Sequence, residues 1–93
     1  MIKSFKDKRT ERIFSGEHVK GIPTELFKKA RRRLAMLNRA LQLEDMYFPP
    51  SNRFHALAGY QPARYAISVD NQWRITFEWH DGDAHNVLFE DYH

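Results

Sequence analysis

The sequence contains no cysteine, which excludes disulfide bonds, thiolate metal sites and cysteine nucleophiles. It also lacks long apolar runs. No stretch approaches the roughly 18 apolar residues of a membrane helix, and residues 1–6 lack the apolar run of a signal peptide. These absences favour a cytoplasmic protein that makes no contact with a membrane.

The chain is also short, with 93 residues. Such a chain buries only roughly 60–65% of its unfolded surface, so we expect one domain spanning residues 1–93. A core of this size leaves little space for a bulky group, and we expect no cofactor. The hydrophobic share of 42% and the charged share of 29% suit a globular domain.

The net charge of +3 conceals a strong segregation of charge along the chain. Residues 1–40 hold twelve lysines and arginines against four acidic residues, a balance of +8. Residues 41–93 hold three against eight, a balance of −5. This asymmetry indicates either a polyanionic or oppositely charged partner or two ordinary solvated surfaces.

Helical signals dominate the first half of the chain. After a weak strand signal at residues 2–5, the pattern predicts a short helix over residues 7–14 and a long one over residues 24–41. The long helix begins at Pro23 and Thr24 and ends before Pro49. Its apolar stripe consists of Leu26, Ala30, Leu34, Leu37 and Leu41.

In the second half the apolar period changes to two, which is typical of strands. Apolar residues alternate over residues 64–69 and 73–80, and a third strand leads to the end of the chain. Asp70–Asn71 and Asp81–Gly82 are turn signals between these strands. The order β-α-α-β-β-β predicts an α+β two-layer fold with a small antiparallel sheet packed on helices.

The alternation also separates the two faces of this sheet. The aromatic face, with Trp73, Phe77 and Trp79, is expected to pack against the helices. The other face receives Arg64, Arg74, Thr76 and Glu78. It is either a binding floor or the solvated face that antiparallel sheets commonly present.

Several segments match a known family pattern. They are Pro-Pro-Ser-Asn-Arg-Phe-His-Ala-Leu-Ala-Gly from Pro49, Asn-Gln-Trp-Arg-Ile from Asn71, and Asp-Tyr-His at the end. With the Met-Ile-Lys-Ser-Phe start, they cover essentially the whole chain. The sequence resembles the HigB toxins, or plasmid-maintenance killer proteins, of the RelE/ParE superfamily.

The resemblance implies a toxin of a type II toxin–antitoxin system with the RelE/ParE-like two-layer fold. Such toxins are endoribonucleases that cut mRNA on the ribosome without a metal and so inhibit translation. A HigA-like helix-turn-helix antitoxin neutralises them, and operator DNA is reached only through that complex. The sequence departs from the family at Ala58, where several relatives carry lysine, and at residues 61–64, where many have Arg-x-Gly.

Metal-free RNA cleavage needs a base near the 2′-hydroxyl, a cation for the developing phosphate charge and an acid for the leaving oxygen. The family motif falls on Arg74 as the phosphate clamp, with a cross-strand pair to Glu78 or a neighbour as the structural alternative. His93 is the candidate acid or base, assisted by Asp91 and Tyr92. The five histidines form no metal motif, and no metal site is predicted.

Further basic residues are candidates for RNA binding. Arg53, His55 and Arg64 lie before or at the start of the meander, where substrate would enter. On the long helix, like charges four residues apart favour a bound anion such as ribosomal RNA. These helix residues are Lys28, Lys29, Arg32 and Arg33. A solvated basic face and an acidic antitoxin are the alternatives for this patch.

Two other functions remain open from the sequence. A non-catalytic, ParE-like toxin would bind and poison a protein such as DNA gyrase, and the absence of a lysine at Ala58 leaves room for it. A toxin-derived module would only bind its antitoxin and help regulate the operon. Arg74 and the His93 tail favour the ribonuclease.

Overall fold

Both predicted helices are present in the computed structural model, which describes residues 1–92. Helix α1 spans Lys8–Ser15. The Asp7 carboxylate caps it by accepting a hydrogen bond from the Thr10 N–H at 2.8 Å. Gly16 ends it in the left-handed region at φ 83°, a conformation that glycine adopts without strain.

Helix α2 spans Thr24–Arg39 and is two residues shorter than predicted. Ala40 is already extended, and Leu41 is 87% exposed. The chain turns here because the Asp45 carboxylate accepts hydrogen bonds from the backbone N–H groups of Leu41 and Gln42, at 2.8 and 3.1 Å. Local capping therefore ends the helix although the apolar spacing continues.

Two short 3₁₀ helices connect α2 to the sheet: η1 (Leu43–Tyr47) and η2 (Pro50–Asn52). The side chain of Asn52 is fully buried between them. Its amide donates hydrogen bonds to the backbone carbonyls of Met46 and Phe48, at 3.0 and 3.2 Å. These bonds fix the segment from which the first strand starts.

The sheet has four antiparallel strands in chain order, β1 (His55–Leu57), β2 (Arg64–Ser68), β3 (Trp73–His80) and β4 (Asp83–Asp91). The three-stranded meander predicted from the alternation is confirmed as β2, β3 and β4. Strand β1 was not predicted, because three residues are too few to show a period of two.

The expected N-terminal strand takes a different form. Residues 2–5 make two isolated parallel bridges, Ile2 to Ala84 and Phe5 to Val87, along the outer edge of β4. The segment therefore runs along that edge as a strap held by two isolated bridges, and it does not form a regular strand. The two-layer α+β architecture is confirmed, with β1 added to the sheet and the first predicted strand reduced to these bridges.

Helix α1 continues the cover of the β4 edge. The Thr10 hydroxyl accepts a hydrogen bond from the Phe89 N–H at 2.9 Å. The Arg9 guanidinium donates to the Phe89 carbonyl, also at 2.9 Å, and lies over the Trp73 and Phe89 rings. Side chains of α1 thus bond the β4 backbone at Phe89, beyond the stretch that residues 2–5 pair with.

A bulge interrupts the pairing of β3 with β4. Glu78 lies opposite His85, whereas Thr76 lies opposite Leu88, so β4 carries one extra residue between these pairs. Asn86, within the extra turn of backbone, has φ 51°. From the bulge toward the end of β4 the register is therefore shifted by one residue.

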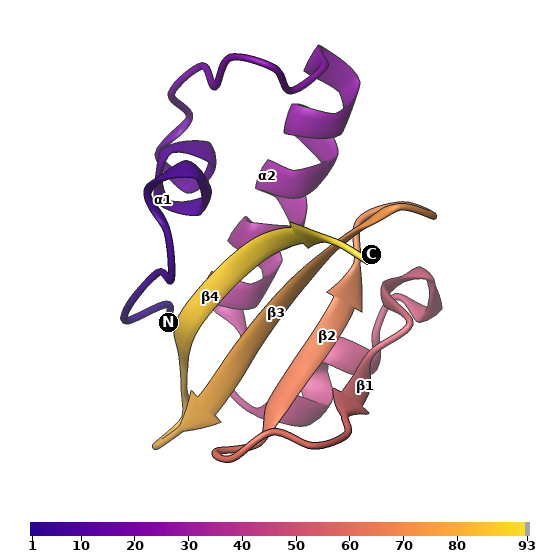
Figure 1. Ribbon diagram of the computed structural model, residues 1–93. Helices are drawn as coiled ribbons and strands as arrows, with labels where there is room; N and C mark the ends of the chain where they lie inside the picture. The colour runs from indigo at the N-terminus through magenta and orange to yellow at the C-terminus, as the bar shows by residue number, and fades with distance from the viewer. Residues whose placement is uncertain (93) are drawn as a thin grey trace.

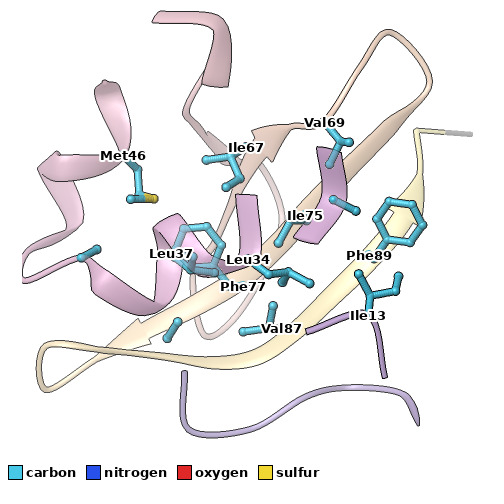
Figure 2. Packing of buried hydrophobic residues seen from close by; sticks show 13 residues of the cluster. Ile13, Leu34, Leu37, Met46, Ile67, Val69, Ile75, Phe77, Val87 and Phe89 are labelled. Carbon is cyan, nitrogen blue, oxygen red and sulfur yellow. The ribbon is translucent and has the colours of Figure 1, made fainter. Parts of the chain in front are cut away.

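The helices cover one face of the sheet, and α2 lies behind the strands in Figure 1. Between the layers lies a cluster of fully buried residues that includes Leu34, Leu37, Ile75, Phe77 and Phe89 (Figure 2). The predicted aromatic face is thus the core face, with Trp73 and Trp79 packed at its margins. No helix within residues 1–92 is long and apolar enough to cross a membrane.

Candidate active site

The face of the sheet opposite the helices, here called the open face, carries rows of mainly polar side chains. Residues paired directly across antiparallel strands place their side chains on the same face. The register therefore forms one row of Ser68, Arg74 and Glu90 and a second row of His55, Ala66, Thr76 and Leu88. Arg64 and Glu78 lie beside the second row.

Arg74 is held by the residue opposite it on β4. Its Nε donates to Glu90 Oε1 at 3.1 Å, and its Nη2 lies 3.0 Å from the same oxygen. The Arg74 guanidinium also stacks over the Tyr92 ring at 5.2 Å. The side chain is 17% exposed. The structure thus brings Arg74 and Tyr92 together, and Glu90 takes the position that the sequence analysis gave to Glu78.

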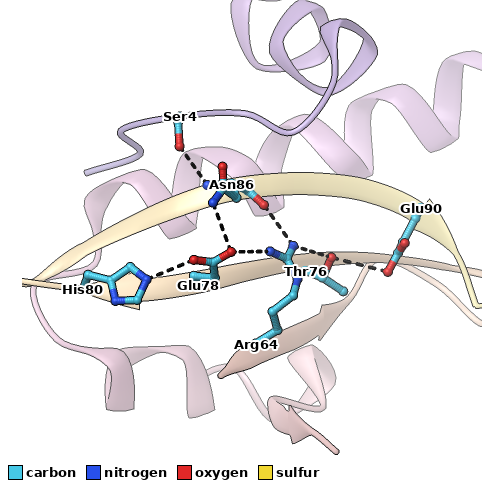
Figure 3. Close-up of polar contacts among 7 residues, drawn as sticks. All are labelled: Ser4, Arg64, Thr76, Glu78, His80, Asn86 and Glu90. Carbon is cyan, nitrogen blue, oxygen red and sulfur yellow. Dashed lines mark hydrogen bonds and ion pairs between the residues drawn. The ribbon is translucent and has the colours of Figure 1, made fainter. Parts of the chain in front are cut away.

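Arg64 is only 5% exposed and lies along the sheet, whereas the sequence analysis expected it at the surface. Its Nη2 donates to Thr76 Oγ1 at 3.0 Å and to the Asn86 carbonyl at 2.9 Å (Figure 3). Its Nη1 lies 3.3 Å from Glu78 Oε2. Bonded in this way, Arg64 links Thr76, Glu78 and the Asn86 backbone on the open face.

Glu78 is the centre of a second set of contacts in Figure 3. Its carboxylate accepts hydrogen bonds from His80 Nε2 and Asn86 Nδ2, both at 3.0 Å. These two bonds, followed by the positive charge of Arg64, lower the pKa of Glu78 below its ordinary value. Glu78 is therefore ionised at neutral pH and balances the buried guanidinium.

His55 is exposed at the start of β1 and lies on the open face at the sheet border opposite β4. Its Nδ1 lies 2.7 Å from the Arg53 carbonyl, which can only accept a hydrogen bond. Nδ1 therefore carries the hydrogen, and in the neutral ring Nε2 has a free lone pair. Arg53 itself is exposed, with φ 48°.

The tail residues do not all join Arg74. Asp91 pairs with Trp73, so the alternation directs it away from the face of Arg74. Its carboxylate accepts a hydrogen bond from the Gln72 amide at 2.9 Å, and the Tyr92 N–H donates to the Gln72 carbonyl at 2.9 Å. His93 lies outside the described residues, so its predicted role stays a prediction.

The basic residues of α2 lie in the helix layer, away from the open face. Lys28, Lys29 and Arg32 are exposed, and Lys28 makes one loose ion pair with Glu25 at 3.9 Å. Arg33 differs, because its Nε donates to the Ser68 carbonyl at 3.2 Å. Burial, with the adjacent charge of Arg32, lowers the pKa of Arg33. Arg33 thus ties α2 to β2 and stands apart from the exposed patch.

The sequence analysis missed Glu90 and Asn86. A hairpin closed at Asp81–Gly82 places Phe89 opposite Arg74 if the register is regular, and only the bulge brings Glu90 there. The isolated Asn86 gave no signal of its own. Within residues 1–92 no three His, Cys, Asp or Glu side chains lie together as metal ligands.

Comparisons with known proteins agree with this architecture. Residues 3–93 match the family model for the HigB-like toxins, described as RelE-like toxins of type II toxin–antitoxin systems. The chain is 32% identical over 93 residues to Endoribonuclease HigB of Proteus vulgaris, covering 100% of both chains.

Two further relatives cover most of the chain. Toxin HigB-1 of Vibrio cholerae serotype O1 is 33% identical over 91 residues, covering 97% of this chain and 96% of the relative. An uncharacterized protein of Haemophilus influenzae is 28% identical over 87 residues, covering 92% and 86%. Together with the family model, these matches show that the chain belongs to the HigB-like family, the RelE-like toxins of type II toxin–antitoxin systems.

Proposed function

We propose that residues 1–93 act as one toxin domain, an endoribonuclease that cleaves mRNA on the ribosome in the cytoplasm and so inhibits translation. The observation that carries this proposal is the arrangement of Arg74. Within residues 1–92 its polar contacts are made by Nε and Nη2, and the Tyr92 ring supports it from one side. The Nη1 side of the guanidinium is left for a phosphate. The name of the Proteus vulgaris relative supports the same activity.

The proposed chemistry combines Arg74 with two histidines, His55 and His93. The 2′-oxygen of the RNA attacks the adjacent phosphorus, the bond to the 5′-oxygen breaks, and a cyclic phosphate remains. Arg74 stabilises the extra negative charge of the transition state through its forked N–H groups. His55 Nε2, with its free lone pair, is suited to take the proton of the 2′-hydroxyl.

His93 is the proposed acid that protonates the departing 5′-oxygen, with Asp91 as a helper and Tyr92 as a stacking surface for a base. Metal ions are not required for this scheme, because the guanidinium and the two imidazoles supply charge and proton transfer. Arg53 would contact the substrate at the β1 end of the open face.

The exposed side chains of Lys28, Lys29 and Arg32 form a basic surface suited to phosphates of ribosomal RNA. We also propose a HigA-like helix-turn-helix antitoxin as the partner that neutralises the toxin. Membership in a type II toxin–antitoxin family supports such a partner. Operator DNA would then be reached through the antitoxin.

The test is induction of the chain in a bacterial host without its antitoxin, followed by mapping of new mRNA 5′ ends. Arg74→Ala is the test variant, and Arg39→Ala, an exposed arginine outside the proposed site, is the matched control. New ends at ribosome-occupied codons in wild type and control but not in Arg74→Ala would support the proposal. Growth arrest without new ends would instead indicate a protein target such as DNA gyrase.

A further inference from the structure

We propose that Glu90 is a positioning residue that orients the Arg74 guanidinium for phosphate binding. This inference deepens the proposed ribonuclease function and rests on it. An arginine side chain has two edges that can each bind an oxyanion with two N–H groups, one formed by Nε and Nη2 and one by Nη1 and Nη2. Glu90 Oε1 occupies the first edge, at 3.1 Å from Nε and 3.0 Å from Nη2.

The occupied edge determines which edge meets the substrate. With Glu90 on the Nε side and the Tyr92 ring 5.2 Å from the guanidinium carbon, the plane and the rotation of the guanidinium are both set. The Nη1 and Nη2 edge then points away from Glu90. A phosphate arriving at this edge finds two N–H groups and displaces no partner that the structure describes within residues 1–92.

Glu90 is itself held by a chain of bonds along the open face. The Thr76 hydroxyl donates to Glu90 Oε1 at 3.3 Å and accepts from Arg64 Nη2 at 3.0 Å. Because Thr76 has one hydroxyl hydrogen, the donation from Arg64 directs that hydrogen toward Glu90. Arg64 is in turn paired with Glu78 at 3.3 Å. Charges of alternating sign thus run from Glu78 to Arg74 across three strands.

This arrangement explains why a carboxylate lies beside a group that must bind an anion. A free carboxylate would repel phosphate, but the charge of the Glu90 carboxylate is compensated by Arg74 and by the hydrogen bond from Thr76. Removing Glu90 should therefore strengthen RNA attraction slightly while releasing Arg74 into several rotamers. Binding and cleavage should respond in opposite directions, which a purely stabilising role for Glu90 would not produce.

The test compares Glu90→Ala with Glu90→Gln in single-turnover cleavage of an mRNA bound to ribosomes, measured over a range of toxin concentrations. Both variants remove one negative charge, but glutamine keeps an oxygen acceptor for Arg74 and Thr76. We expect the maximal rate to fall about 10–100-fold in Glu90→Ala and about threefold or less in Glu90→Gln. The half-saturating concentration should stay the same or fall in both. Glu44→Ala, an exposed acid on η1, is the charge-matched control.

A second measurement observes Arg74 without cleavage. The ¹⁵N–¹H signal of Arg74 Nε should be sharp in wild type and Glu90→Gln, and broadened by solvent exchange in Glu90→Ala. A wild-type maximal rate in Glu90→Ala, or equal losses in both variants, would overturn the positioning role alone, provided that Arg74→Ala is inactive. Wild-type cleavage by Arg74→Ala would overturn the proposed function as well, so the two failures are distinguishable.

Discussion

Arg64 and Glu78 form an ion pair that is almost withdrawn from solvent, with side-chain exposures of 6% and 13% and a separation of 3.3 Å. The pair lies on the sheet face expected from its sequence to be open. Through Thr76 and Glu90, the pair is linked along that face to Arg74.

Acidification is expected to destabilise the protein through Glu78. Its pKa is lowered in the folded state, first by His80 and then by Asn86 and Arg64, from an ordinary value of 4.5. The stabilisation is therefore fully present above that value and is lost as the pH falls through the lower folded pKa. Thermal melting across this range should show a steeper acid loss in wild type than in Glu78→Gln. The same dependence of melting temperature on pH in both proteins would contradict the prediction.

Arg64→Ala is expected to unfold the protein more easily, because it leaves the Glu78 carboxylate without its charge partner in a largely buried setting. Loss of one partner of a buried ion pair costs about 3 kcal/mol, measurable by urea denaturation. Arg74→Ala should stay close to wild type in the same assay, because its pair is at the surface of the network. If Arg64→Ala has the same urea denaturation midpoint as wild type, the buried ion pair does not contribute to the free energy of unfolding.

The Asn86 backbone can be tested with two variants that lose the same side-chain bond to Glu78. At φ 51°, glycine is relaxed and alanine is strained. Asn86→Ala is expected to be less stable than Asn86→Gly by about 1 kcal/mol. Urea denaturation midpoints of the two purified variants supply the measurement. Equal midpoints would mean that the bulge relaxes when its side chain is removed.

The basic surface of α2 is expected to affect docking and not chemistry. Replacing Lys28, Lys29 and Arg32 together by alanine should weaken ribosome binding at low salt and lower the slope of affinity against salt by about 2. Pelleting with ribosomes at several salt concentrations measures this slope. The single-turnover rate at saturating toxin should be unchanged, and an unaltered slope would assign the patch to another partner.

The sequence predicts the layers of the fold better than the details of the site. Apolar periods place the two helices and the meander, since these patterns depend on burial alone. They do not show how far a long side chain folds back along the sheet, and Arg64 was therefore expected at the surface. Its neighbours Thr76 and Glu78 on the same face gave no sign of the pairing.

Register is the second quantity that the sequence leaves undetermined. The Asp81–Gly82 turn fixes the pairing only up to the bulge, and a single extra residue exchanges Phe89 for Glu90 opposite Arg74. Phe89 thereby enters the core and Glu90 reaches the open face. The candidate catalytic arginine was found from its motif, but the carboxylate that holds it depends on this one-residue shift.

The strap of residues 2–5, with α1 behind it, also decides where this sheet can grow. Along β4, the backbone groups of Ala84, Val87 and Phe89 are already bonded to the strap or to α1 side chains. An incoming strand would have to displace these hydrogen bonds before it could pair with β4. The opposite border is β1, only three residues long. The molecule therefore offers little template for self-association through its strands, and a partner chain that extends the sheet would be directed to the border beside His55.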